Sequence, residues 1–73
     1  MIAVDMQARF VPAHLESVTL TPEERRAATV RGHIVYVNYG HKYFTVEYER
    51  NGITYKESFN FVDCGKTVHV RGY

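Results

Sequence analysis

The chain has 73 residues, a formal net charge of +1 and a single cysteine, Cys64. This length allows one small domain, whose core is marginal without a metal, a disulfide or a partner. One cysteine excludes an intramolecular disulfide, and the near-neutral charge excludes the basic excess of a dedicated duplex-DNA binder. Because the sequence has neither a charged-then-apolar start nor a long apolar run, we expect a cytosolic protein without a signal peptide or membrane span.

Residues 1–20 are predicted to form an extended N-terminal segment that supplies the first strand, and residues 21–73 a helical turn followed by strands. Pro12 would confine the first strand to an edge or a bend. Thr21, Pro22 and Glu24 then predict a short helical turn over residues 21–28. Thr21 stands at the N-cap, Pro22 at the first helical position and Glu24 three residues later, which is a capping box.

The strongest strand signal is the Asn51-Gly52 dipeptide, which favours a two-residue hairpin turn. Apolar and polar residues alternate on both sides of it, over 42–50 and 53–61. A two-residue loop fixes the register and places aromatic residues opposite each other and opposite charges together. The predicted pairs are Tyr48 with Tyr55, Phe44 with Phe59, and Glu47 with Lys56.

The preceding strand, residues 30–38, is predicted to pair with 42–50 across an odd-length loop around residues 39–41. This register keeps the apolar residues on one face. It pairs Val37 with Tyr43, Tyr36 with Phe44, Ile34 with Val46, and His33 with Glu47. A last strand over 67–71 follows a turn at 63–66 and completes a four-strand antiparallel meander. Its predicted apolar face consists of Val30, Ile34, Tyr36, Phe44, Val46, Tyr48, Ile53, Tyr55, Phe59 and Phe61.

A sheet this short must curl or be covered to keep its apolar face dry. With the first strand added, we predict a mostly β protein, a small five-stranded SH3-like antiparallel barrel with one short helical turn. The segment Gly32-His33-Ile34-Val35-Tyr36-Val37-Asn38, a short loop, and Tyr43-Phe44-Thr45-Val46-Glu47-Tyr48 resembles the opening hairpin of SH3-like barrels of the KOW and Tudor kind. In size and style the chain is also similar to short proteins carried by phages and mobile elements. The resemblance to SH3-like barrels covers under a third of the chain. It implies that a ligand would bind at loop tips and at exposed aromatic residues.

No arrangement of residues that would support catalysis is apparent. Cys64 lies in a predicted surface turn beside Asp63, which raises the pKa of a thiol, and no phosphate loop or serine–histidine–carboxylate motif is present. The four histidines lack the close spacing of metal ligands. We therefore predict a protein that is not an enzyme and that uses no metal or cofactor.

Glu57 is unusual because the predicted register points it toward the apolar face, opposite Val46. An unpaired buried carboxylate is costly. Its head could reach water at the rim, pair with a basic residue such as Arg9, or turn outward at a bulge. Alternatively, it could anchor a basic group of a partner.

Apolar and aromatic residues on the polar face of the meander predict an interaction patch, unless residues 1–20 cover it. The candidate binding residues are Val35, Val37, Tyr39, His41, Tyr43 and Asn60. They favour a protein-interaction module, for which an inhibitor or accessory protein of a phage or mobile element, including the anti-CRISPR type, is one form. An exposed edge strand would also allow pairing with a second copy.

The alternative is a small barrel that binds single-stranded or structured nucleic acid, with tyrosines stacking on bases and basic residues on phosphates. The candidate contacts are Arg31, Lys42, Arg50, Arg71 and Tyr73. Phosphate binding weakens steeply with salt, whereas an apolar contact does not, so a salt titration separates the two functions.

Overall fold

The β3–β4 hairpin is the element that local sequence determines most directly. In the computed structural model, which describes residues 2–16 and 19–71, β3 (Tyr43–Arg50) and β4 (Ile53–Asn60) are joined by Asn51 and Gly52. Their φ angles are 53° and 77°, which glycine adopts freely and asparagine more readily than most residues. The two-residue loop has the geometry that hairpins favour, and the register confirms all three predicted pairs, Tyr48–Tyr55, Phe44–Phe59 and Glu47–Lys56.

Strand β2 (Val30–Asn38) follows the predicted register only in its first part. His33 faces Glu47 and Ile34 faces Val46, as predicted, but a β-bulge then shifts the pairing between Ile34 and Tyr36. The bulge leaves Val35 without a partner on β3.

The bulge exchanges the faces of the residues that follow it. Tyr36 faces Thr45 and Val37 faces Phe44, so the predicted pairs Tyr36–Phe44 and Val37–Tyr43 are wrong. Val37 packs against the core, whereas Tyr36 is 48% exposed. The extra residue therefore allows Ile34 and Val37 both to point inward, while the tyrosine keeps its hydroxyl in water.

The N-terminal part of the chain contains more regular structure than the expected extended segment. It forms the strand β1 (Gln7–Phe10), which pairs with β2, and then a short helix, α1 (Ala13–Glu16). The next helix, α2 (Pro22–Ala28), confirms the predicted helical turn. Thr21 accepts a hydrogen bond from the Glu24 amide, and the Glu24 carboxylate accepts one from the Thr21 amide. These hydrogen bonds lower the pKa of the Glu24 carboxyl.

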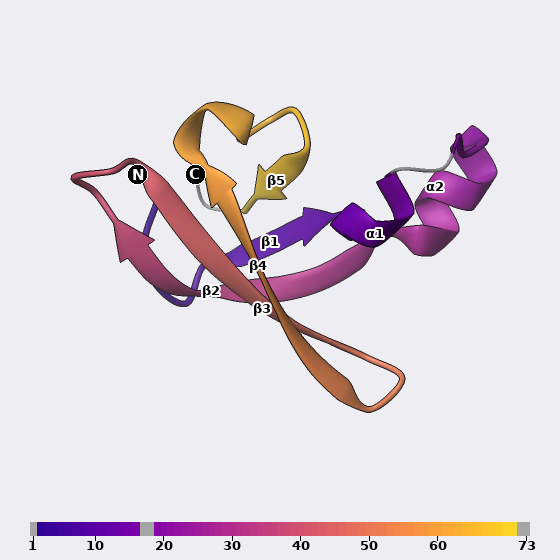
Figure 1. Cartoon of the computed structure of the whole chain (residues 1–73), viewed down its shortest axis with the longest axis horizontal. Coiled ribbons are helices and arrows are strands. Elements are labelled where there is room, and N and C mark those ends of the chain that lie inside the picture. The colour runs from indigo at the N-terminus through magenta and orange to yellow at the C-terminus, as the bar shows by residue number, and fades with distance from the viewer. Residues whose placement is uncertain (1, 17–18, 72–73) are drawn as a thin grey trace.

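Strand β5 (Val68–Val70) pairs with β1, not with β4, so the meander has three strands where four were predicted. A one-turn 3₁₀ helix, η1 (Phe61–Asp63), leads the chain away from β4 toward β1 (Figure 1). The strand order is β4-β3-β2-β1-β5, which leaves β4 and β5 at opposite edges. The protein is thus mostly β, with one five-stranded antiparallel sheet that does not close into the predicted barrel.

The core lies on the concave side of this curved sheet. Five of the residues predicted for the apolar face are buried there, namely Ile34, Phe44, Val46, Tyr48 and Phe59. The N-terminal segment and β5 add Ile2, Ala8, Phe10 and Val68. The ring of Phe10 contacts those of Tyr48 and Phe59 edge-on, with centroids 5.1 and 4.8 Å away.

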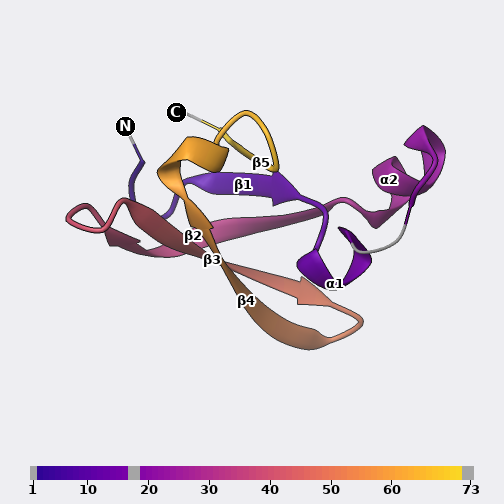
Figure 2. The same ribbon diagram turned by 45° about the horizontal axis from the view of Figure 1, so that its top comes forward.

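The far end of the β3–β4 hairpin projects beyond this core (Figure 1). For this reason Ile53 and Tyr55 are exposed, although the sequence placed them on the apolar face. The ring of Tyr55 stacks on that of Tyr48 at 5.4 Å, which covers one side of it. Helix α1 lies beside the hairpin in Figure 2, where the Ala13 amide donates a 3.2 Å hydrogen bond to the Glu57 carboxylate.

Candidate functional site

The convex side of the sheet carries a concentration of positive charge over β5, β1 and β2. Two adjoining hollows open there, the first of about 370 Å³, and both are lined by Arg9, Arg31 and His69. Arg71 completes the first hollow, and residues from α2 and from the turn before β5 complete the second. We call the group the basic surface, which consists of Arg9, Arg25, Arg26, Arg31, Lys66, His69 and Arg71.

The strand register explains why the centre of this surface is so basic. In β1 the buried residues Ala8 and Phe10 alternate with Gln7 and Arg9, which are exposed. Arg9 has Arg31 of β2 as its Cα partner on one side and His69 of β5 on the other. Residues directly opposite each other on neighbouring strands point to the same face. Three basic side chains therefore form a row across three strands.

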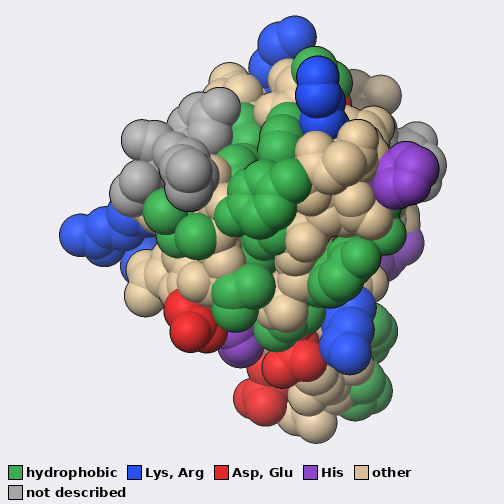
Figure 3. All heavy atoms as spheres, turned by 90° about the vertical axis from the view of Figure 1, so that its left-hand side faces the viewer, with side chains coloured by type: hydrophobic (Ala, Val, Ile, Leu, Met, Phe, Trp, Pro, Cys, Tyr) green, Lys and Arg blue, Asp and Glu red, His purple; other side chains and the backbone are tan. Residues whose placement is uncertain are grey.

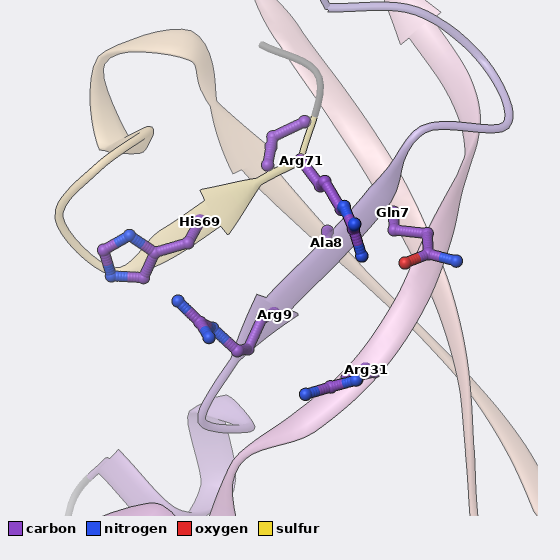
Figure 4. A pocket seen from close by; sticks show the side chains of 7 residues that line it. Gln7, Ala8, Arg9, Arg31, His69 and Arg71 are labelled. Atoms are coloured by element: carbon purple, nitrogen blue, oxygen red, sulfur yellow. The ribbon is translucent and has the colours of Figure 1, made fainter.

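The side chains in Figure 4 follow this register. Arg9 extends toward His69, Arg31 stands beside it on β2, and the guanidinium of Arg71 extends over β1 toward Gln7. The Arg71 amide donates a 2.8 Å hydrogen bond to the Gln7 carbonyl, which fixes the chain after β5 against β1. Each of these arginines is thus held on a hydrogen-bonded strand or at its end.

The other basic side chains come from the two segments that flank the strands. Arg25 and Arg26 lie in the last turn of α2, whose start is fixed by its capping box. Lys66 lies in the turn before β5, where its amide donates to the Asp63 carbonyl at 3.0 Å. The basic surface holds six of the nine lysines and arginines of the chain.

The acidic residues that the structure describes lie outside the lining of the two hollows. Within residues 2–16 and 19–71, neither hollow has an aspartate or a glutamate in its lining. Glu47 and Glu49 lie on β3 and Glu57 lies on β4, on the other side of β2 from β1. Glu23 and Glu24 precede Arg25 on α2, and Asp63 of η1 precedes Lys66, so acidic residues also border the basic surface.

A second surface lies on the same face of β2, β3 and β4, next to the row of His33, Glu47 and Lys56, and its own residues are uncharged. Tyr36 pairs with Thr45 and Asn38 with Tyr43, and β4 extends these two rows with Ser58 and Asn60. The rings of Tyr36 and Tyr43 are 5.9 Å apart, and the hydroxyls of Thr45 and Ser58 are hydrogen-bonded at 2.9 Å. We call this the tyrosine surface, made of Tyr36, Asn38, Tyr43, Thr45, Ser58 and Asn60. Figure 3, a view of the end that carries the β2–β3 turn, shows hydrophobic side chains gathered across its middle.

The six residues predicted to form an interaction patch are divided among several places. Tyr43 and Asn60 are partners on the tyrosine surface, while Val35 is the half-buried bulge residue and Val37 packs against the core. The Tyr39 ring meets Phe61 edge-on, and its hydroxyl donates a 2.5 Å hydrogen bond to the Ile2 carbonyl. His41 is exposed on the turn, where its amide donates to the Asn38 side chain.

The residues proposed to contact nucleic acid are also separated. Arg31 and Arg71 lie together on the basic surface. Lys42 and Arg50 stand beside opposite ends of β3, away from it, and Tyr73 lies outside the described residues. Sequence reasoning did not include Arg9 and His69 in this site. Their alternation with the apolar residues of β1 and β5 was a signal, but only the pairing of these two strands brings them together.

The remaining candidates for chemistry are accounted for by local structure. Glu57 is half-buried and accepts the hydrogen bond from Ala13 already described. Burial, and then the charge of Asp63, raise the pKa of the Cys64 thiol, so the thiolate is disfavoured. Across the described part of the chain, no three histidine, cysteine or carboxylate side chains are grouped so as to hold a metal ion.

The helices that the structure describes are too short and too polar for any of them to cross a membrane. A scan against protein-family models gave no match for the chain, and searches of the curated proteins and of the solved structures gave none.

Proposed function

We propose that this chain is a non-enzymatic module that binds single-stranded or structured nucleic acid through its phosphates. The observation that carries the proposal is the basic surface, which gathers six of the nine lysines and arginines without a carboxylate in its described lining. Several closely spaced cations suit a polymer with a negative charge on every unit. Five of the six are arginines, whose planar guanidinium binds phosphate oxygens in pairs.

The composition of the surface favours recognition of the backbone over recognition of bases. Phe10 is the one aromatic residue in the described lining of the two hollows, and its side chain is buried. Base-stacking platforms need exposed aromatic rings. Binding should therefore depend weakly on nucleotide sequence and strongly on ionic strength.

A salt titration with two charge-matched double variants tests this function. The probe is a labelled RNA of about 20 nucleotides and mixed sequence, for which each phosphate contact contributes about −0.7 to the slope of log K against log salt. The variant R31Q/R71Q removes two cations from the basic surface, and K42Q/R50Q removes two cations elsewhere. We expect R31Q/R71Q to weaken binding at least tenfold and to reduce the slope by about 1.4, while K42Q/R50Q stays close to wild type.

The two variants have the same net charge, so a difference between them reports position alone. Equal losses in both would mean that the RNA is attracted by overall charge and that the basic surface is not a site. No measurable binding by the wild-type protein at low salt would reject the nucleic-acid function.

The tyrosine surface supports a second candidate, a protein-interaction module of the inhibitor or accessory type. Tyr36 is 48% exposed beside Tyr43 on a surface whose own residues are uncharged, which is the composition of the centre of many protein interfaces. Capture of one defined protein, kept through nuclease and high salt and lost in Tyr36→Ala, would favour this candidate. Loss of all captured material on nuclease treatment would favour the first.

We also propose that the open sheet is a form of the small SH3-like barrel that its hairpin resembles. The five strands, the strong curvature around one core and the single helical turn before β5 support this relation. In this arrangement the basic surface lies on strands, and not on the loop tips that the resemblance implies.

A further inference from the structure

The central row of the basic surface is unusual because its residues repel one another when all are charged. Arg9 stands between Arg31 and His69 in the register, with Cβ atoms of such partners normally about 4.5–5.5 Å apart. Like charges directly opposite each other destabilise a sheet. A row of this kind is more readily explained by a bound anion than by the stability of the free protein.

The third member of the row differs from the other two in that its charge depends on pH. Arginine remains charged throughout the physiological range, whereas a histidine side chain exchanges its proton between about pH 5 and pH 8. A neutral His69 reduces the repulsion in the free protein. A phosphate held against Arg9 and Arg31 would favour the protonated imidazole, which then adds a further donor to the anion.

Most of the charged groups around His69 are cations. Arg9 faces it from β1, Arg31 from β2, and Arg25 and Arg26 line the same hollow from α2. Lys66 and Arg71 flank it on its own segment. Glu23 and Glu24 of α2 and Asp63 of η1 lie on the flanking elements, but among the residues that the structure describes no carboxylate lines either hollow.

We propose that Arg9, Arg31 and His69 form a proton-linked phosphate site, in which one phosphodiester group of a nucleic acid lies over β1 and takes up a proton on His69 as it binds. This inference rests on the proposed nucleic-acid function and adds a particular subsite and a pH dependence to it. His33 also lies on β2, but its Cα partners are Gln7 and Glu47, and that carboxylate can neutralise it without a ligand.

The test measures the affinity for the RNA of about 20 nucleotides between about pH 7.5 and pH 6, at constant ionic strength. We expect the wild-type affinity to rise several-fold as the pH falls, by no more than tenfold per pH unit because one proton is linked to binding. His69→Gln should lose most of this rise, so that its affinity at about pH 6 stays close to its own affinity at about pH 7.5. His33→Gln and the exposed-turn variant His41→Gln should keep it.

A companion variant separates a binding role from a structural one. Arg9→Gln removes the residue that lies between Arg31 and His69, so we expect the affinity for RNA to fall at least tenfold. Because the variant also removes repulsion within the row, the melting temperature should stay equal or rise. A lower melting temperature would make Arg9 a structural residue and overturn the proposal. Inorganic pyrophosphate at the same phosphate concentration should compete weakly, and competition equal to that of the RNA would show a site for free phosphate instead.

The subsite and the proposed function fail in different ways. Salt-sensitive RNA binding that is independent of pH, or whose pH dependence disappears in His33→Gln, would overturn the subsite and leave the nucleic-acid function in place. Absence of RNA binding at every pH would reject both.

Discussion

Gly32 lies where three strands of the sheet come together, with Ala8 of β1 and Tyr48 of β3 as its partners. A Cβ added at this position would lie 2.4 Å from the Glu47 carbonyl oxygen, 2.8 Å from Cγ1 of Val46 and 3.0 Å from Cβ of Tyr48. Two of these atoms belong to the backbone or lie next to it, so they cannot move aside easily. The absence of a side chain thus permits the close approach of β3.

Gly32→Ala should therefore destabilise the protein, by about 1–3 kcal/mol, because the methyl group forces the two strands apart. Gly40→Ala is the matched control, because its Cβ would meet only the Asn38 side chain, at 3.5 Å. Thermal unfolding of the two variants makes the comparison. Equal melting temperatures would show that β2 can adjust to a side chain at this crossing.

At the same scale, the sequence predicted pairs of residues better than it predicted exposure. Tyr48 and Tyr55 pair as expected, yet Tyr55 is exposed, because the pattern of alternation does not reveal how far the core extends along a strand. Glu57 shows the same limit. Its register was predictable, but its hydrogen-bond donor was not, because the Ala13 amide lies 44 positions away in the chain.

Among the elements, the helix α2 has no buried residue. All but the last of its residues are exposed, so its capping box and the tertiary position of its ends hold it in place. Arg25 and Arg26 nevertheless reach the basic surface from its last turn. Helix α2 is therefore positioned by local hydrogen bonds, and it contributes positive charge to the basic surface but no side chain to the hydrophobic core.

Thr21→Ala should loosen α2 without unfolding the sheet. Loss of an N-cap of this kind costs about 1 kcal/mol, which is roughly a fivefold loss of amide protection in the helix. We expect a melting temperature close to wild type, faster hydrogen exchange over residues 24–28, and RNA binding weakened a few-fold. Thr54→Ala, an exposed change on β4, should leave all three unchanged.

The bulge in β2 explains why the sequence predicted this element only in part. The register with an odd-length loop was preferred because it kept the two faces of a regular strand separate. The structure keeps this register as far as Ile34, but from Tyr36 onward each residue of β2 pairs one position further along β3. An irregularity of one residue carries no periodic signal, so alternation alone could not find it.

For the molecule as a whole, stability depends on one small core. Phe44 and Val46 are completely buried near its centre, and both segments that flank the meander contribute to it. We expect Phe44→Ala to prevent folding, because removing a buried phenylalanine costs about 3–5 kcal/mol, much of the stability of a domain this small.

The control for this change is Tyr36→Ala, which the predicted register would have made equally damaging. Since Tyr36 is 48% exposed, its removal should lower the stability by less than about 1 kcal/mol. Circular dichroism melts of the two variants distinguish the bulged register from the regular one. Two similar losses would contradict the bulge.

The topology was the part of the whole molecule that local patterns predicted least. Val68 and Val70 pack into the core, but the sequence analysis assigned their strand to β4 as its neighbour and not to β1. Strands that follow each other in the chain are usually neighbours in the sheet. The connection through η1, which carries the chain from β4 to β5 without pairing the two strands, has no distinctive sequence motif. The basic surface was missed for the same reason, because it depends on β1 and β5 meeting.

The pairing of β1 with β5 also determines when the protein can first act during its synthesis. The meander and most of the core residues come from the middle of the chain, so a ribosome releases them well before His69 and Arg71. Contacts between residues so distant in sequence also form late and slowly. A nascent chain can therefore have a folded hairpin while it still lacks the row formed by Arg9, Arg31 and His69, and its affinity for phosphates should appear only after β5 has left the ribosome.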